Sequence, residues 1–551
     1  MKRAIVTSGF LRFLALLPFL IHSYPQLASA DSGSLKITVV DEAGALLPCR
    51  AWVDQKSQRL FNPTQPPTTT PYDRDQSFSC DGWFEMVTPA GQAIVHIEKG
   101  KEWLPKDIPV EINANRVTEY TVTMERWIDM RSKNFYSSDL HIHFGNDSPR
   151  ILEQLGAADD LDIIPAFSYW LRGTEKEWKA DWPHWPSGPS FETKTNRIIS
   201  RNNLEIERIF SRAQPGGSVG ASFLFNLQSP VTADHYDTRF PTDADLCLLA
   251  RATSPGVVID TDKPSWAETV VGAILGAYDT VQVCHNHYHR EQTIPGGWGM
   301  IGPIGEHEKE LTIENELFHR TNEQYYSFLN CGIRLAVSGV SAIGVMPVPA
   351  GYNRVYAEVN GPLTAQKFWH AVRQGKSFAT SGPMLFLDIN NKRLGDHIEY
   401  QSHEKNELSI NIEVQSIDRL LSLEIVHNGQ VIRQIALDGN SPTPVLNSKH
   451  HFKHFPSRSG WYAGRAIYES PHGHLRQAHT SPIYLSVDGK PTAFKRDADY
   501  MIQWIDKLLE IANEPDRFQS QIDHNEVIGT YQRAKDAYQA VSALAVEIWN
   551  D

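Results

Sequence analysis

An aspartate and two histidines alternate in the segment "SSDLHIHFG", residues 137–145. Side chains alternate between the two faces of a β-strand, so Asp139, His141 and His143 would share one face, with Leu140 and Ile142 on the other. Neutral imidazole and carboxylate are common ligands of zinc, manganese and iron. The spacing therefore predicts metal ligands along one strand. The alternative is a buried polar strand whose histidines are hydrogen-bonded.

A second group of alternating histidines occurs in "CHNHYHR". His285, His287 and His289 follow an apolar run that is typical of a buried strand. The first two are candidate ligands, and His289 is expected to face solvent in a loop.

Two glutamates in "NNLEIERIF" could add a ligand or a general base. They are Glu205 and Glu207. The alternative is an exposed helical pair that forms ion pairs with Arg201 and Arg208.

Four further charged residues are weaker candidates. Asp260 and Asp262 in "VIDTDKPSW" are expected at a helix N-cap or in a turn. Arg290 and Arg354 could hold an anionic substrate group, or each could pair with a structural carboxylate.

An aromatic cluster lies in "EWKADWPHWPSGPSF". We expect a loop folded over the mouth of the site; the alternative is a stacking wall for a sugar or aromatic substrate. Its members are Trp178, Trp182, His184 and Trp185.

Residues 129–385 alternate strand-like and helical stretches, and these must position the candidate residues. "LDIIPAF", "GASFLFNL" and "TVQVCHN" read as buried strands, and "SPRILEQLGAADD" and "WAETVVGAILGA" as helices between them. Such alternation is typical of a parallel sheet, here an α/β barrel. In barrels the functional residues gather at the C-terminal strand ends, where His143, His285 and His287 would lie.

Short alternating runs flank this segment on both sides. Residues 31–128 and 386–490 each predict a β-sandwich, and the first resembles the prealbumin-like modules that precede exported enzymes. In residues 491–551, apolar positions recur three and four apart, which predicts a helical tail packed on a neighbouring domain. The expected fold class is multidomain α/β plus β.

The first 30 residues are typical of a secretory signal peptide. Lys2 and Arg3 precede an apolar run at 13–21, which is shorter than the roughly 20 residues of a membrane span. An A-x-A cleavage site ends at Ala30. We therefore expect an exported chain that begins at Asp31, is periplasmic or extracellular, and has no membrane span.

The net charge limits the kinds of partner that the protein can bind. A net charge of -13 without a basic run argues against nucleic acid as a partner.

Cys49 and Cys80 both lie in the first folded segment and are the candidate disulfide of an exported protein. Alternatively, all five cysteines are small buried residues. The oligomeric state stays open.

Several of these motifs together resemble a known family. "DLHIH" on the first strand of an α/β barrel resembles the opening motif of the PHP metallohydrolase superfamily. The blocks "AADDLDIIPAF", "SFLFNLQSP", "VIDTDKPSWAE", "NRVYAEV" and "QGKSFATSGPMLFL" resemble its CehA/McbA branch, over residues 129–490. The resemblance implies a PHP-like barrel, divalent metal ions and hydrolysis of an ester, amide or phosphoester.

The chain departs from that family pattern at two places. Many members carry Thr-Asp-His after the second strand, where this chain has "IPAFSYWLRG". Many end the site with Gly-Ser-Asp-x-His, where it has "VSGVSAIGV". A complete multinuclear site is therefore not expected. The family's ligands that the chain keeps are His141, His143 and the "HNHYH" cluster, with Glu205 or Glu207 as a further one. The predicted site therefore has the ligands His141, His143 and His287, of which His287 aligns with a later histidine of the family, then His285 and Asp139. Glu207 is the further ligand or base, and Arg354 the anion-binding residue.

These observations predict an exported, metal-dependent hydrolase with a small-molecule or glycan substrate. A bound zinc, manganese or iron ion lowers the pKa of its water to near 7, and the resulting hydroxide would attack the substrate. The alternative is a binding protein on a degenerate barrel, for instance for glycans, without turnover. Convergence of His141, His143 and His287 on one point would distinguish the two.

Overall fold

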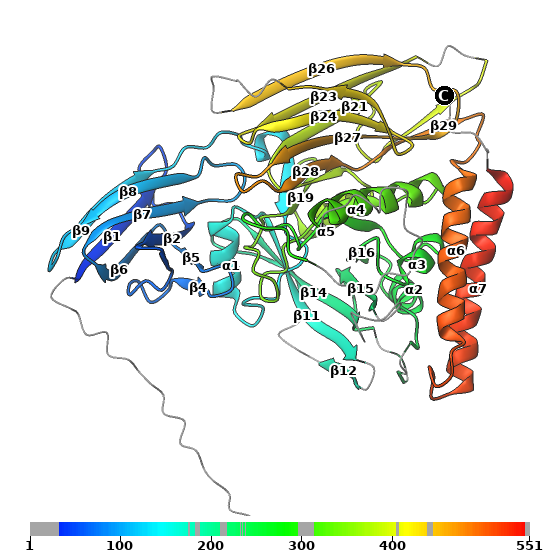
Figure 1. The fold of residues 1–551 in the computed structure, drawn as a ribbon, viewed down its shortest axis with the longest axis horizontal. Helices are drawn as coiled ribbons and strands as arrows, with labels where there is room; N and C mark the ends of the chain where they lie inside the picture. The colour runs from blue at the N-terminus through cyan, green and yellow to red at the C-terminus, as the bar shows by residue number, and fades with distance from the viewer. Residues whose placement is uncertain are drawn as a thin grey trace, which may run out of the picture.

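A computed structural model describes residues 32–545, apart from 175–176, 182–187, 210–217, 232, 234, 237–238, 296–312, 404–406 and 438–444. The protein is mixed α/β and rich in strands, with several sheets and a C-terminal helical pair (Figure 1). The predicted signal peptide lies outside the described residues. So do Trp182, His184 and Trp185; Trp178 has a described backbone in a short strand, but its side chain is not described.

Two sheets enclose the apolar core of the N-terminal unit. One has the strand order β6-β1-β9 and the other β4-β5-β2-β7-β8, with β3 paired to β2. Alternate residues of β1, among them Leu35, Ile37 and Val39, are fully buried between the sheets. The strands are β1 (Ser32–Val40), β2 (Cys49–Gln55), β3 (Gln58–Leu60), β4 (Thr70–Tyr72), β5 (Ser77–Cys80), β6 (Trp83–Pro89), β7 (Gly91–Glu98), β8 (Lys106–Ile112) and β9 (Val117–Thr123).

Strands of the middle segment pair in a ring. The successive pairs are β10–β11, β11–β14, β14–β15, β15–β16, β16–β17 and β17–β18. The ring closes where the Leu140 N–H donates to the Gly339 carbonyl at 3.4 Å and Ile142 bridges Ile343. These strands are β10 (Phe135–Ser138), β11 (Ile163–Thr174), β14 (Ile198–Ile209), β15 (Ser218–Phe225), β16 (Val258–Thr261), β17 (Thr280–Cys284) and β18 (Ala336–Gly339). Two short strands, β12 (Glu177–Asp181) and β13 (Phe191–Glu192), pair at the side with β11 and β14.

The ring is parallel except at β15, which runs antiparallel to both of its neighbours. Residues 210–217 are all that separates β14 from β15. A parallel crossover needs about a dozen residues or more, so this connection can only return the chain antiparallel. The expectation of a parallel sheet therefore holds for the other strands of the ring and is wrong for β15.

The segment around Glu205 forms a strand, so the helical alternative for it is wrong. In β14, Leu204 and Ile206 are fully buried in the core, while Glu205 and Glu207 take the alternate positions. This period of two is that of a strand with one apolar face.

Helices connect the strands of the ring. Ser148 caps the first of them, because its hydroxyl accepts from the Ile151 N–H at 3.4 Å and Pro149 follows in the first turn. The helix expected from "SPRILEQLGAADD" is thus confirmed. These helices are α1 (Pro149–Ala158), α2 (Asp243–Thr253), α3 (Thr269–Ile274) and α4 (Ile313–Asn330). The short helix η1 (Arg131–Lys133) precedes the ring, and α5 (Ala365–Arg373) follows it.

The ring continues into the C-terminal unit through paired strands. β19 pairs with β10, β20 with β19, and β28 with β20. A second sheet, β21-β23-β26, packs on this extension around a shared apolar core. The strands are β19 (Arg354–Glu358), β20 (Ser377–Thr380), β21 (Met384–Ile389), β22 (His397–Tyr400), β23 (Leu408–Ser416), β24 (Leu420–His427), β25 (Gln430–Ile435), β26 (Leu446–His454), β27 (Gly460–Glu469), β28 (Leu475–Thr480) and β29 (Ile483–Val487).

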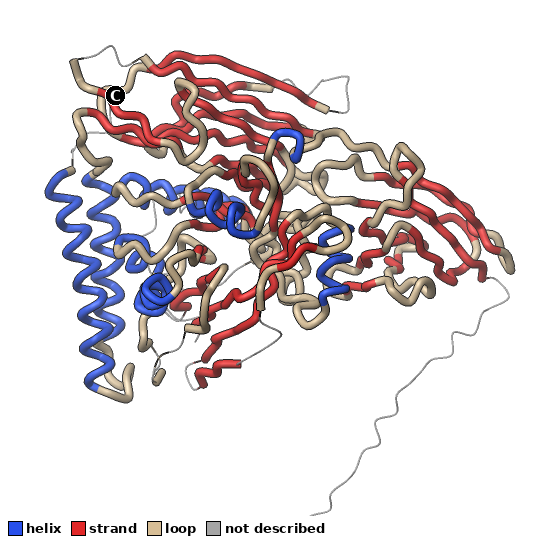
Figure 2. The backbone as a smooth tube through the Cα atoms, turned by 180° about the vertical axis from the view of Figure 1, so that it is seen from behind, coloured by secondary structure: helices blue, strands red, loops and turns tan. Residues whose placement is uncertain are grey.

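The C-terminal helices α6 (Lys495–Ala512) and α7 (Gln521–Leu544) lie along one edge of the molecule (Figure 2). The indole N–H of Trp504 donates to the Ala267 carbonyl at 3.1 Å, and the Tyr538 hydroxyl to the Val270 carbonyl at 3.0 Å. The predicted packing of a helical tail on a neighbouring unit is thereby confirmed. Within the described part of the chain, no helix is long and apolar enough to cross a membrane.

Candidate metal centre

The histidine pair lies just beyond the C-terminal end of β10. The regular strand ends at Ser138 and the chain bends at Leu140, but Ile142 still bridges Ile343 and the His143 N–H donates to the Ile343 carbonyl at 2.8 Å. Leu140 and Ile142 are fully buried in the apolar core. The imidazoles of His141 and His143 approach each other, so they share one side of the chain, as the alternating pattern predicts.

Glu205 reaches the same place from β14. The register of the sheet pairs it with Trp170 on β11 and with Phe223 on β15. Directly paired residues point to the same face, and the Phe223 ring lies 4.3 Å from the ring of His141. Sheet pairing thus brings together residues that are far apart in the sequence.

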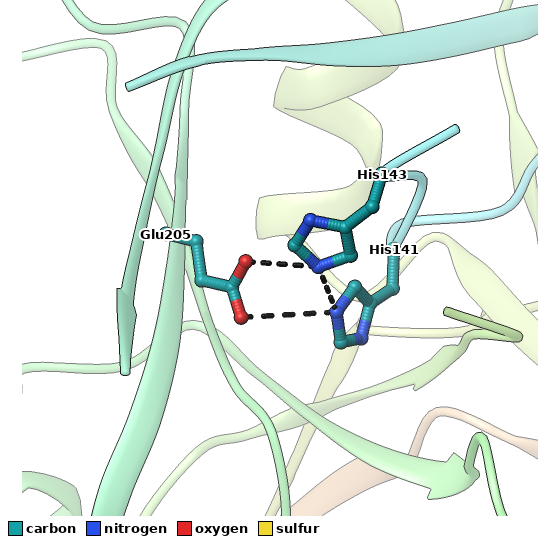
Figure 3. Close-up of side chains that lie close together, drawn as sticks. All are labelled: His141, His143 and Glu205. Atoms are coloured by element: carbon teal, nitrogen blue, oxygen red, sulfur yellow. Dashed lines mark hydrogen bonds and ion pairs between the residues drawn. The ribbon is translucent and has the colours of Figure 1, made fainter. Parts of the chain in front are cut away.

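The three side chains converge on one point (Figure 3). The Nε2 atoms of His141 and His143 are 2.8 Å apart, and Glu205 oxygens lie 3.8 Å and 3.0 Å from them. Ligands about 2.0–2.1 Å from a tetrahedral zinc ion are roughly 3.3 Å apart, which these distances bracket. A divalent cation could therefore be bound by His141, His143 and Glu205 together.

The hydrogen-bonding state of this group also fits a cation. The side chains are between 4 % and 6 % exposed. Within the described residues, the Nδ1 atoms of His141 and His143 have no hydrogen-bond partner, and Glu205 Oε2 lies 3.0 Å from Nε2 of His143. When His143 is neutral and this Nε2 carries a lone pair, the buried carboxylate oxygen has no donor there, and a cation between the two atoms would offset that cost.

The pKa values of the two imidazoles are shifted in opposite directions. Burial, followed by the nearby charges of His143 and Lys263, lowers the pKa of His141 well below its usual value. Burial also disfavours the charged form of His143, but the Glu205 carboxylate outweighs it, and the pKa of His143 is raised. His141 is therefore neutral at neutral pH, as a metal ligand must be.

Aromatic rings and further charges surround the group. The Trp170 ring lies 4.7 Å from that of His143, and the Phe167 ring 5.5 Å from it. Glu207 and Arg172 act on the charge of His143 from the next positions outward along β14 and β11. Glu207 thus lies beside the group and outside the His141–His143–Glu205 set.

Asp139 lies outside the metal group and has a backbone role. Its carboxylate accepts from the N–H groups of His141 at 3.1 Å, Ser341 at 2.9 Å and Gly351 at 2.7 Å. These bonds hold the segment after β10 against the segment after β18. The prediction of Asp139 as a ligand is corrected accordingly.

His285 and His287 also lie outside the His141–His143–Glu205 set. Nδ1 of His287 donates to the Ile294 carbonyl at 2.6 Å, and Nδ1 of His285 accepts from the His287 backbone N–H at 3.3 Å. Burial lowers the pKa of His285 well below its usual value. His287 was expected to converge with His141 and His143, but the metal group contains Glu205 in its place. His285 and His141 both lie near Lys263.

His289 was expected to face solvent, and this is wrong. It is 5 % exposed, and its Nε2 lies 3.3 Å from the Asp75 carboxylate of the N-terminal unit. Arg290 binds the same carboxylate and also Glu98, at 2.7 Å. Of the two alternatives for Arg290, the structural pairing is the one observed.

Arg354 is fully buried and is also corrected from an anion-binding to a structural residue. Its guanidinium donates to the backbone carbonyls of Gly351, Asp160 and Asp159 at 2.7, 3.2 and 2.8 Å. These bonds tie the start of β19 to the loop before β11.

Asp260 is not at a helix cap. It lies inside the ring, where it accepts from Thr280, Gln282 and Ser338 at 2.5–2.8 Å. Asp262 accepts from the Trp266 indole at 2.8 Å, in the turn predicted for it.

Glu205 is the residue whose part the sequence left undecided. Apolar residues at 204 and 206 alternate with the two glutamates, and this period of two could have identified a strand. The choice of Glu205 over Glu207 depends on the register of β14 against β11.

No family model matches the chain, and no curated protein is significantly similar to it.

Proposed function

We propose that the protein binds a divalent metal ion at His141, His143 and Glu205 and hydrolyses an ester, amide or phosphoester of a small molecule or glycan. The convergence of these three side chains is the observation that supports the proposal. When bound, zinc, manganese or iron supplies a water of lowered pKa and polarises a carbonyl or phosphoryl oxygen.

The position of the group supports an enzyme. Most strands of the ring run in one direction, so their C-terminal ends meet at one end of it. His143 follows β10, Lys263 follows β16 and His285 follows β17, and active sites of α/β barrels lie at this end. A PHP-like barrel with a reduced metal site is the fold that we propose on this basis.

The chain's own residues have separate parts in the proposed reaction. His141 offers a neutral nitrogen lone pair, His143 would release its proton when the metal binds, and the Glu205 carboxylate would offset the charge of the cation. The rings of Trp170 and Phe167 lie beside His143, and such apolar surroundings strengthen electrostatic interactions there.

Metal analysis tests the binding part of the proposal. Wild-type protein, loaded with zinc, manganese or iron and dialysed, should retain one ion per chain by mass spectrometry of the elements. The double change His141→Ala and His143→Ala, and separately Glu205→Gln, should abolish retention. The matched control is His450→Ala with His451→Ala on β26, which should retain the ion. Wild-type protein that retains no stoichiometric metal would contradict the hydrolase and favour the alternative, a binding protein without turnover.

Hydrolysis is then measured on the loaded protein with 4-nitrophenyl acetate, 4-nitroacetanilide and 4-nitrophenyl phosphate. We expect release of nitrophenol or nitroaniline that disappears with the metal and in Glu205→Gln. If the metal-loaded protein cleaved none of the three substrates, the proposed hydrolase activity would be contradicted, and only the proposed metal binding would remain.

A further inference from the structure

A separate cavity of about 430 Å³ lies where the N-terminal, middle and C-terminal units meet. Its walls come from residues 96–107 of the first, 349–354 of the second and 468–472 of the third. It shares no residue with the metal group. Small-molecule sites have volumes of roughly 300–1,000 Å³ and occur preferentially at such domain junctions.

Most charged side chains around this cavity already have partners. Arg50 pairs with Asp159 at 2.5 Å, Arg290 with Glu98 at 2.7 Å, and Lys99 donates to two backbone carbonyls. The remaining pairs are Arg59 with Asp54 and Glu291, His96 with Asp107, and Arg354 with backbone carbonyls. These groups form the wall of the cavity.

Among the described lysine, arginine, aspartate and glutamate side chains that line the cavity, Lys101 and Asp418 are the exceptions. The Lys101 ammonium lies 3.9 Å from the centre of the Tyr352 ring. Among the described residues, neither side chain has a hydrogen bond or an ion pair within 4.0 Å, although each acts on the charge of the other across the cavity. Burial lowers the pKa of Lys101 to about 8 and raises the pKa of Asp418. Apart from the Tyr352 ring beside Lys101, one cation and one anion therefore face the same space without a charged or hydrogen-bonded partner among the described residues.

The backbone is shaped to admit the carboxylate. A Cβ atom at Gly382 would lie 2.4 Å from Asp418 Oδ2 and 3.0 Å from the Tyr468 hydroxyl oxygen. The absence of a side chain at this position leaves the space that the carboxylate occupies.

We propose that this cavity binds a small zwitterion, a free α-amino acid, whose carboxylate pairs with Lys101 and whose ammonium pairs with Asp418. Both residues are half-buried, and a bound ligand would shield them further from water. A ligand of a single charge would compensate one of the two residues and leave the other without a counter-charge. A zwitterion compensates both and bridges a gap that is too wide for a direct ion pair. The site is independent of the metal centre.

Binding is tested by calorimetry on the full-length chain with each of the twenty common L-amino acids. At least one should bind saturably. Its N-acetyl derivative, which lacks the cation, and its amide, which lacks the anion, should each bind at least about tenfold more weakly, because each loses one charge-assisted hydrogen bond. Absence of binding by all twenty, or equal binding of the derivatives, would overturn the proposal.

Three variants assign the binding to this cavity. Lys101→Met and Asp418→Asn should each weaken it at least about tenfold. Gly382→Ala keeps both charges but displaces the Asp418 carboxylate, so it should also weaken binding. This variant tests the site even if a charge variant does not fold. Lys56→Met, on an exposed turn of the same unit, should bind like the wild type. Unchanged affinity in all three cavity variants would contradict the site. Chelator-treated protein should bind equally well, which separates this result from that of the metal centre.

Discussion

The Tyr72 hydroxyl of the N-terminal unit accepts a hydrogen bond from the Gly344 N–H at 2.8 Å. Gly344 follows Ile343, whose carbonyl accepts from the N–H of His143. The Tyr72 ring also lies 5.3 Å from that of Phe144. The N-terminal unit therefore holds the segment that carries one of the candidate ligands, which makes it part of the scaffold of the metal centre.

Removal of this hydroxyl should weaken metal binding. Tyr72→Phe leaves the Gly344 N–H, and the Met346 carbonyl to which the hydroxyl donates, without their partner. We expect a loss of about 1–3 kcal/mol in the free energy of unfolding. The dissociation constant for zinc should rise, measured by competition with a chelating dye. The control is Tyr120→Phe, whose hydroxyl has one exposed contact at 3.4 Å. Equal zinc affinity in the wild type and Tyr72→Phe would argue against the coupling.

A side chain at position 344 should displace His143. Gly344 has a φ of 106°, and a Cβ there would lie 2.8 Å from the Cβ of His143. Gly344→Ala should therefore reduce the metal content and cost about 1–3 kcal/mol of stability from backbone strain. Gly91→Ala is the matched control, because Gly91 has a φ of 121° and no atom within 4 Å of its Cβ position. If both variants lost the metal, backbone strain alone would explain the loss, and displacement of His143 would not be needed.

The Asp75 carboxylate should make the stability depend on acid pH. Burial by itself would raise the pKa of Asp75, but Arg290, His289 and Arg50 outweigh it and hold that pKa well below its usual value. A lowered pKa means that the folded state binds the proton less well than the unfolded state. The stabilisation is therefore complete above the unfolded pKa, about 3.9, and is lost as the pH falls toward the folded pKa.

Urea unfolding of the wild type and Asp75→Asn at a series of pH values tests this. The variant should be less stable at pH 7, by about 3 kcal/mol, since removal of one partner leaves buried arginines undercompensated. This difference should begin to shrink between about pH 5 and pH 3, because the wild type loses part of its advantage there and the rest only at lower pH. A constant difference over that range would contradict the assignment.

Cys49 and Cys80 should form a disulfide when the protein is oxidised. They pair directly across β2 and β5, and their sulfur atoms lie 3.6 Å apart as free thiols. Directly opposite residues of antiparallel strands lie about 4.5–5.5 Å apart at Cα, which a disulfide can span. After exposure to oxidised glutathione, intact mass should show the loss of two hydrogens, and a thiol reagent should no longer label either residue under denaturing conditions. Cys49→Ser should retain a labelled Cys80; unchanged labelling of both cysteines in the wild type would rule out the bridge.

The helices and strands could be predicted where their signals are local. The N-cap at Ser148 and the alternating pattern of β1 act within a few residues, so they can be read from the chain. The direction of β15 was missed, although the short connection at 210–217 carries the signal. His289 and Arg290 could not be placed, because their partner Asp75 comes from another unit.

The sequence by itself determined that His141 and His143 share one side of the chain. An extended backbone alternates its side chains whatever its neighbours are, so the spacing suffices. The tertiary structure decided the third member, because Glu205 joins the pair through the order and register of β10, β11 and β14. It also decided that Asp139 and Arg354 bind backbone groups, since those carbonyls and N–H groups come from segments that meet only in the folded chain. Local spacing can place side chains on a face, but pairing between distant strands determines what that face meets.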